Sequence, residues 1–440
     1  MPVNWRIEVE WEALQSAPAE EQACFGAIGI SVNNLWLTEG HDYLANRLRA
    51  KPYLSGYHLA EWFAWNWWRL RWEPRALSRE WGQTHCMSSI GQGYIWPNIT
   101  IFSDGERTTL VSAPTAERAE IPFRYISGYA AVLPAGQFEA GLDEFFSQIL
   151  HRLEAQGVSG TNFHSIFESL EEERSSPQLS TRRKFEALLG EDPDEADPII
   201  LTQLLADAEE ASADSIQEVA ATRAQTGATP ALKDLIALAQ MKGFDASSRD
   251  AVRLRDHAGL TPSESVPAWL LGARAARALR DQERLNGHPI SDIELAALAG
   301  TTPNALVPAQ DRLADFSFMV DSQKETSRLI LRSKWHEGRR FELARLLGDR
   351  LLAPRSNRLF PATRAYTYRQ KMQRAFAAEL LSPFDEVETI LQGDYSSEGQ
   401  RDAAEHFDVS PLMIRTLLVN HHRIPSEELS DDFDAVSTVA

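Results

Sequence analysis

The sequence predicts an α+β protein whose parts differ sharply in composition. Ten of the twelve tryptophans lie at or before Trp96, acidic residues concentrate in the middle of the chain, and apolar residues recur at helical spacing towards its end. We therefore expect a β-containing, tryptophan-rich domain of mixed α/β structure at 1–155, a helical acidic connector at 156–265, and a mostly helical domain with a small sheet at 266–425. The remainder, 426–440, is acidic and poor in core-forming residues, which is typical of a frayed tail.

The first domain carries the clearest strand signals. Residues 94–113 alternate polar and apolar side chains on both sides of a Ser-Asp-Gly-Glu turn, and this pattern predicts a β-hairpin. Residues 123–136 predict another strand. Residues 138–157 have apolar side chains near helical spacing, which predicts an amphipathic helix that ends at Gly157.

The segment Tyr57–Trp72 concentrates aromatic and basic side chains in this first domain. As a helix it places aromatic residues on more than one face, which favours a helix buried between two layers. The alternative is a partner-binding surface, because Trp and Arg are enriched among the residues that dominate protein interfaces. The candidates for that role are Trp62, Trp65, Trp68, Arg69, Arg71 and Trp72.

The middle of the chain is predicted to be helical and strongly acidic. Residues 151–230 contain 16 acidic and 6 basic residues, a net charge of -10 out of -19 for the whole chain. Residues 201–221 predict one helix. Residues 221–234 are small and include Gly and Pro, which is typical of a flexible link.

Composition restricts the compartment and the partners. The chain has no run of about 18 apolar residues and no basic stretch followed by an apolar one at its start, so we expect a cytoplasmic protein without membrane segments. Cys24 and Cys86 are too few for a disulfide framework and lack zinc-ligand spacing. A net charge of -19 and a pI of about 5.1 do not favour nucleic-acid binding, because the phosphate backbone repels an acidic chain.

Two strings in the last domain resemble a known family. Residues 340–349 read RFELARLLGD, and residues 376–383 read FAAELLSP. This pair resembles the ImmA/IrrE family of bacterial metallo-endopeptidases, whose motifs are R-F-x-L-A-H-E-x-G-H and E-A-N-x-F-A-A-x-L-L-M-P. The lead-in at 267–300 and the closing helices at 396–424 extend the resemblance to about a third of the chain. It implies a zincin-like domain with short strands near 317–333.

The resemblance also implies that the catalytic metal site has been lost. In the family, two His residues and the Glu of E-A-N hold zinc, while the Glu beside the first His acts as general base. The matching positions hold Arg345, Asp349, Met372 and Leu346, respectively. A guanidinium only donates, a thioether is a soft ligand and Leu accepts no proton. We therefore expect no metal, no cofactor and no catalytic residue here.

Three further expectations concern the same motif. Arg345 and Asp349 stand four residues apart, and we hypothesise that they form an ion pair where the metal would be. Gly348 matches a family glycine and predicts close approach of a neighbouring element. A rewired metal site that uses His336, His421 or His422 is the less favoured alternative.

Residues 396–424 have the pattern of a helix-turn-helix, with Asp408-Val409-Ser410 as the turn. In a DNA-binding protein the second helix would project polar and basic side chains into the major groove. The candidate contacts are Arg415, Asn420 and Arg423. The favoured interpretation is that this helix pair packs the domain, as in the family.

Taken together, these features predict a non-catalytic, ImmA/IrrE-like regulatory or protein-interaction protein of a bacterial stress, mobile-element or phage-defence circuit, with a protein as its partner. The alternatives are a hydrolase with a rewired metal site or an activity in its N-terminal domain, and a DNA-binding transcriptional regulator that uses the C-terminal helix pair.

Overall fold

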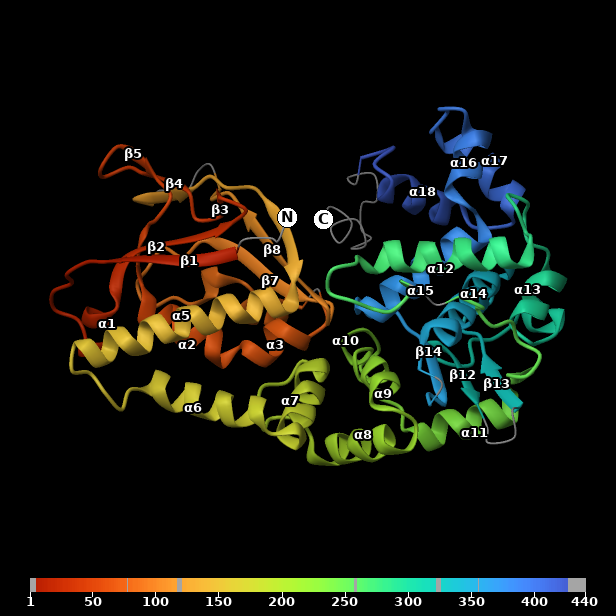
Figure 1. Ribbon diagram of the computed structural model, residues 1–440, viewed down its shortest axis with the longest axis horizontal. Helices are drawn as coiled ribbons and strands as arrows, with labels where there is room; N and C mark the ends of the chain where they lie inside the picture. Colours follow the sequence, from red (N-terminus) through yellow and green to blue (C-terminus); the bar gives the residue numbers. More distant parts are fainter. Residues whose placement is uncertain are drawn as a thin grey trace. The chain divides into compact units, whose positions relative to one another are not determined.

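The structure confirms the α+β class, with many helices and several small antiparallel sheets (Figure 1). It is a computed structural model that describes residues 5–76, 78–116, 121–256, 259–321, 326–354 and 356–425. The chain divides into two compact units, Met1–Asp197 and Pro198–Ala440, called here the N-terminal and the C-terminal unit. Among the described helices, none is long and apolar enough to cross a membrane.

The N-terminal unit combines short strands with helices. Its strands are β1 (Trp5–Trp11), β2 (Phe25–Val32), β3 (Leu35–Trp36), β4 (Gly40–Asp42), β5 (Arg47–Arg49), β6 (Tyr53–Ser55), β7 (Asn98–Ser103), β8 (Arg107–Ala113), β9 (Phe123–Tyr125) and β10 (Ala130–Pro134). Its helices are α1 (Ala19–Ala23), α2 (Gly56–Trp65), α3 (Trp67–Trp72), α4 (Arg79–His85), α5 (Ala135–Ala155), α6 (Asn162–Ser175), α7 (Pro177–Leu189) and the 3-10 helix η1 (Met87–Ser89).

Three antiparallel sheets form from these strands. One has the order β1-β2-β3, with β6 also paired to β2; the others have the orders β10-β8-β7 and β5-β4-β9. The expected hairpin is confirmed as β7 and β8, and its turn uses Gly105 at a φ of 104°. The expected single strand over 123–136 is two strands, because β9 pairs with β4 while β10 pairs with β8.

Helix α5 organises the core of the N-terminal unit. It packs on β1, β8, β10 and α2, and it ends two residues before Gly157, as expected. Its buried face carries Phe138, Leu142, Phe145 and Ile149 at helical spacing. Helices α6 and α7 pack on α2 and α3, so the first part of the acidic region predicted at 156–265 belongs to this unit.

The C-terminal unit is mostly helical. Its helices are α8 (Pro198–Glu210), α9 (Ala213–Ala220), α10 (Arg223–Thr226), α11 (Leu232–Lys242), α12 (Ala268–Glu283), α13 (Asp292–Leu298), α14 (His336–Leu352), α15 (Tyr368–Leu381), α16 (Phe384–Leu391), α17 (Ser397–Phe407), α18 (Pro411–Asn420) and the 3-10 helix η2 (Pro303–Leu306). Its strands are β11 (Phe244–Ser247), β12 (Ser317–Asp321), β13 (Thr326–Ile330) and β14 (Leu359–Ala362).

One antiparallel sheet of order β11-β13-β12-β14 anchors this unit. Helix α14 packs on β12 and β14, and α15 packs between α14 and α12 (Figure 1). The close approach expected at Gly348 is present, because a Cβ there would lie 2.4 Å from a ring carbon of Phe376. The glycine therefore sets the distance between α14 and α15.

Two expectations for the middle of the chain differ from the structure. The single helix predicted at 201–221 is broken into α8 and α9, because Ser212 leaves the helical conformation and its hydroxyl caps α9 at Ser215 N. The link predicted at 221–234 contains helix α10 and the start of α11. The tail predicted to be frayed, 426–440, lies outside the described residues.

Substitution of Gly348 by Ala tests the α14–α15 contact. The added Cβ would overlap the ring of Phe376, so we expect a loss of about 1–3 kcal/mol in the free energy of unfolding, measured by chemical denaturation. Gly82→Ala is the control, because no atom lies within 4 Å of a Cβ at this helical position. It should be neutral or stabilising by up to about 1 kcal/mol. Equal effects of the two substitutions would contradict the contact.

Candidate functional site

The motif positions Arg345, Leu346 and Asp349 lie on helix α14. The stripe Ala344, Leu347 and Leu351 points into the core of the C-terminal unit. Arg345 and Asp349 occupy another face of the same helix, and both side chains are buried. A buried charge needs a partner, so the groups around these two residues decide what the site can do.

Asp349 is neutralised by a residue of the neighbouring helix. Arg369 on α15 donates from Nε to Oδ1 and from Nη2 to Oδ2 of Asp349, each over 2.7 Å. This is the bidentate geometry that makes arginine–carboxylate pairs strong. The cation that engages both carboxylate oxygens thus belongs to Arg369, and the hypothesised ion pair between Arg345 and Asp349 stays a prediction.

Arg345 donates to neutral acceptors on two other segments of the C-terminal unit. Its Nη2 donates to the carbonyl oxygen of Thr363 and to Oε1 of Gln370, each over 2.6 Å. The amide nitrogens of Gln370 and Gln373 both donate to the carbonyl oxygen of Pro361 in β14, over 3.0 Å. Polar groups thus join α14, α15 and β14 around Arg345.

A buried glutamate borders this network. Glu218, on α9, accepts a hydrogen bond of 2.7 Å from the Thr367 hydroxyl, which caps α15. Burial raises the pKa of Glu218, although the charge of Arg369 acts in the opposite direction. Arg369 also donates to the Ser215 hydroxyl over 3.4 Å, so α9 is tied to α15 at this point.

The remaining motif positions offer no metal chemistry. Leu346 and Met372 are buried in the apolar core of the C-terminal unit. The groups of α15 that face Arg345 and Asp349 are Arg369 and Gln370, together with Gln373. Asp349 is the one anionic group among the four motif positions, and its two oxygens are already engaged. This set of residues does not fit a zinc ion.

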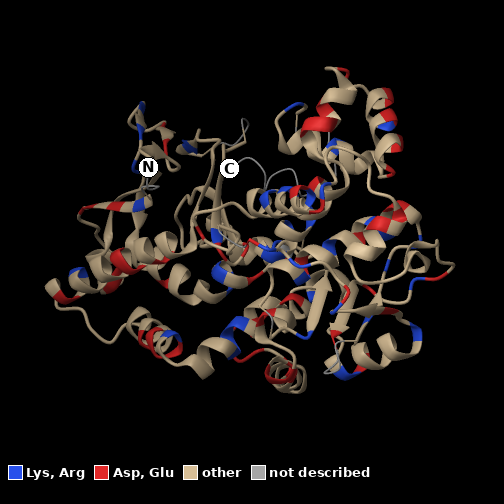
Figure 2. Cartoon of the chain, turned by 45° about the vertical axis from the view of Figure 1, so that its right-hand side comes forward, with Lys and Arg blue, Asp and Glu red and all other residues tan. Residues whose placement is uncertain are grey.

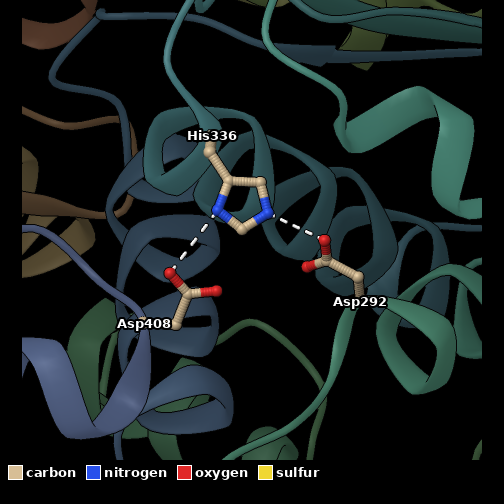
Figure 3. A group of neighbouring side chains, drawn as sticks. All are labelled: Asp292, His336 and Asp408. Carbon is tan, nitrogen blue, oxygen red and sulfur yellow. Dashed lines mark hydrogen bonds and ion pairs between the residues drawn. The ribbon is translucent and has the colours of Figure 1, made fainter.

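A second cluster does contain potential ligands. Among the described residues, Asp292, His336 and Asp408 form the group of three whose ligand atoms lie within 4.8 Å of one another. Figure 3 shows the imidazole between the two carboxylates, with Nε2 2.7 Å from Asp292 and Nδ1 3.4 Å from Asp408. The cluster joins the start of α13, the start of α14 and the turn between α17 and α18.

The arrangement favours a hydrogen-bonded clamp over a metal site. A metal would take one ring nitrogen of His336, but the two carboxylates lie against opposite nitrogens (Figure 3). The buried guanidinium of Arg340 also contacts both of them: Nη1 pairs with Asp292, and Nε lies 3.4 Å from Asp408 Oδ2. A fixed positive charge at this place opposes a second cation.

The other two histidines named for a rewired site are not brought into this cluster. His421 stacks on Phe384, with ring centroids 3.5 Å apart and an interplanar angle of 7°. Burial, with the positive charge of Arg277, lowers the pKa of His421 from 6.5 to about 4. His422 is exposed. His421 therefore acts as a neutral aromatic side chain in a packed contact.

The helix pair expected at 396–424 is present as α17 and α18. Asp408 makes the turn with a φ of 53°, and the Ser410 side chain caps α18. The charges on and beside this helix pair do not favour DNA binding. The preceding helix α16 carries three acidic and no basic residues, and α17 carries three acidic residues and one arginine (Figure 2). Arg423 pairs with Glu388, while Arg415 and Asn420 are partly buried. The candidate contacts thus form no free basic surface.

The aromatic segment of the N-terminal unit is mostly core. Five of the six candidate partner-binding residues are buried or partly buried: Trp62, Trp68, Arg69, Arg71 and Trp72. Trp68 Nε1 donates to Glu173 over 2.6 Å, and the cations of Arg71 and Lys184 each lie over the ring of Trp72. Trp65 is 56% exposed, so it is the member of this set that a partner can reach.

The polar groups of this segment serve an internal network. Arg69 pairs with Glu73, with Nε 2.8 Å from Oε2, and also with Asp192. The fully buried His85 donates from Nδ1 to the Ile101 carbonyl oxygen over 2.6 Å. Its Nε2 lies 2.9 Å from Glu73 Oε2, and its ring stacks on Trp81. These contacts hold α3, α4 and β7 together, so Arg69 has a packing role.

The main residues that sequence analysis missed are Arg369, Gln370 and Glu218. Their roles depend on contacts between α9, α14 and α15, which are distant in sequence. A local signal existed only for α15, where the polar residues at 369, 370 and 373 share one side of the helix. This pattern indicates that one side of α15 makes a polar contact, but it does not identify the residues contacted.

Removal of Arg369 should leave the Asp349 carboxylate buried and unpaired. We expect Arg369→Met to lower the free energy of unfolding by about 3–5 kcal/mol, whereas Arg423→Met, which breaks the exposed pair with Glu388, should have little effect. In a double-mutant cycle, Asp349→Leu should recover part of the loss in Arg369→Met. Additive losses would show that the two side chains do not interact.

His421 should make stability depend on pH. Its folded-state pKa lies below the unfolded value, so the unfolded chain binds more protons as the pH falls from about 6.5 to about 4. We expect a loss of about 1–2 kcal/mol over this range, allowing for solvent screening of the half-buried ring. His421→Phe keeps the stack on Phe384 and should remove this part of the slope. His422→Phe should leave it unchanged, and the opposite result would refute the assignment.

Comparison of the whole chain with protein-family models, with curated proteins and with solved structures found no match in any of the three. The resemblance of the C-terminal motifs to ImmA/IrrE peptidases therefore remains a prediction.

Proposed function

We propose that this chain is a non-catalytic, ImmA/IrrE-like protein that binds a protein partner in the bacterial cytoplasm. Its C-terminal unit would keep the scaffold of the peptidase family without the zinc chemistry. Family members with complete sites act in stress, mobile-element and phage-response circuits, and we place this chain in a circuit of that kind. It would bind a partner there without cutting it.

One observation carries the proposal: Asp349 is bound on both oxygens by Arg369. Of the four motif positions, Asp349 is the one whose side chain is suited to zinc. Its pairing with a buried guanidinium leaves no ligand for a metal and no base for water. The packing features of the motif persist around it, namely the buried stripe of α14 and the close contact at Gly348.

Metal analysis of the purified full-length chain tests the loss of catalysis. After dialysis against zinc, we expect much less than one zinc per chain and no cleavage of unfolded protein substrates. A stoichiometric zinc that is lost on Asp349→Ala or Met372→Ala would overturn the proposal. Glu337→Ala, on the exposed side of α14, serves as the matched control for general effects of losing a carboxylate.

A further inference from the structure

The N-terminal ends of α13 and α14 expose large apolar side chains. Trp335, the residue before α14, is 74% exposed, and Ile293 in the first turn of α13 is 71% exposed. Val307, directly after η2, is 58% exposed. Single exposed apolar residues are common on protein surfaces, so three of them matter only if they lie together.

Hydrogen bonds hold the three elements together. Asp292, next to Ile293, bonds to His336, next to Trp335, over 2.7 Å (Figure 3). Arg339 links η2 to the segment before α14, because it donates to the carbonyl oxygens of Ala305 and Ser333.

The segment after Val307 is bound to the segment before Trp335 as well. The amide of Ala309 donates to the carbonyl oxygen of Lys334 over 3.0 Å. Each of the three exposed apolar residues thus lies within two residues of a hydrogen bond that joins its own segment to one of the other two segments. We call Ile293, Val307 and Trp335 the Trp335 patch.

The charges around the patch indicate what kind of partner fits. Among the exposed side chains of 291–294, 307–315 and 334–337, four are acidic and two are basic. Asp292 and Asp408 are partly exposed too, but Arg340 contacts both, so the acidic excess comes from the four exposed residues, Glu294, Asp311, Asp315 and Glu337. A second copy of this chain would bring a like-charged rim against this one, which electrostatic complementarity disfavours.

We propose that the Trp335 patch is a docking surface for a basic, apolar segment of a partner protein. The aromatic ring would insert between apolar side chains of the partner, and lysine or arginine side chains would meet the acidic rim. Trp is the residue type most enriched among dominant interface residues, and here it is already held at the surface by the helix start behind it. This proposal rests on the proposed function, because it names the surface at which the protein partner would bind.

Selection from a displayed random-peptide library against the full-length chain tests this surface without knowledge of the partner. We expect enriched peptides that combine apolar residues with a net positive charge. Titration calorimetry with one such synthetic peptide should show at least a tenfold weaker affinity for Trp335→Ala. Ile293→Ser should also weaken binding, as should Glu337→Lys, which reverses a rim charge.

The control is Trp65→Ala, which removes an exposed tryptophan from the N-terminal unit and should leave the affinity unchanged. Circular dichroism of each variant separates lost binding from lost folding. Peptides that are acidic, or whose affinity is the same for wild type and Trp335→Ala, would overturn the proposal, and so would a library without enriched peptides. These results leave the zinc analysis untouched, so the surface can fail while the non-catalytic assignment stands.

Discussion

The ion pair between Asp349 and Arg369 is the constraint on which the C-terminal unit depends. A carboxylate without solvent contact is costly unless a cation meets it, and here the cation comes from the neighbouring helix. The bidentate contact fixes the rotation of α15 against α14. That rotation turns Gln370 towards Arg345 and the backbone of β14, so helix and strand are held by the same set of bonds.

This network links the two helices without a metal ion. Arg345 donates from α14 to Gln370 on α15, and Arg369 on α15 donates to Asp349 on α14. Introduction of a metal site at these positions would require changes on both helices at once. Each single substitution would leave a buried group of the network without its partner, at a cost of several kcal/mol.

Local features of the sequence predicted the fold class, the β7–β8 hairpin and helix α5 correctly. The Asp-Gly turn and the apolar periodicity act within a few residues of each other, so the sequence alone displays them. The close approach at Gly348 was also predictable, since few residues other than glycine fit there.

The partners of Arg345 and Asp349 were not predictable in this way. The structure joins Asp349 to Arg369, a residue twenty positions away, and no local pattern points to that contact. The aromatic segment at 57–72 was ambiguous for a similar reason. Its composition is compatible with either an interface or a core. The packing of α5, α6 and α7 against it shows that most of it belongs to the core. The local sequence pattern does not contain the information that determines contacts between residues far apart in the chain.

The uneven distribution of tryptophan has a spectroscopic consequence. Ten of the twelve indoles belong to the N-terminal unit, and most of these are buried there. Intrinsic fluorescence of the native protein therefore reports chiefly on that unit, whereas the far-ultraviolet dichroism of the helices reports on both. The C-terminal unit contributes Trp269 and Trp335, of which the second is largely in water. Melting of the N-terminal unit can thus be followed by fluorescence in the intact chain, and a dichroism change that fluorescence does not follow reports on the C-terminal unit.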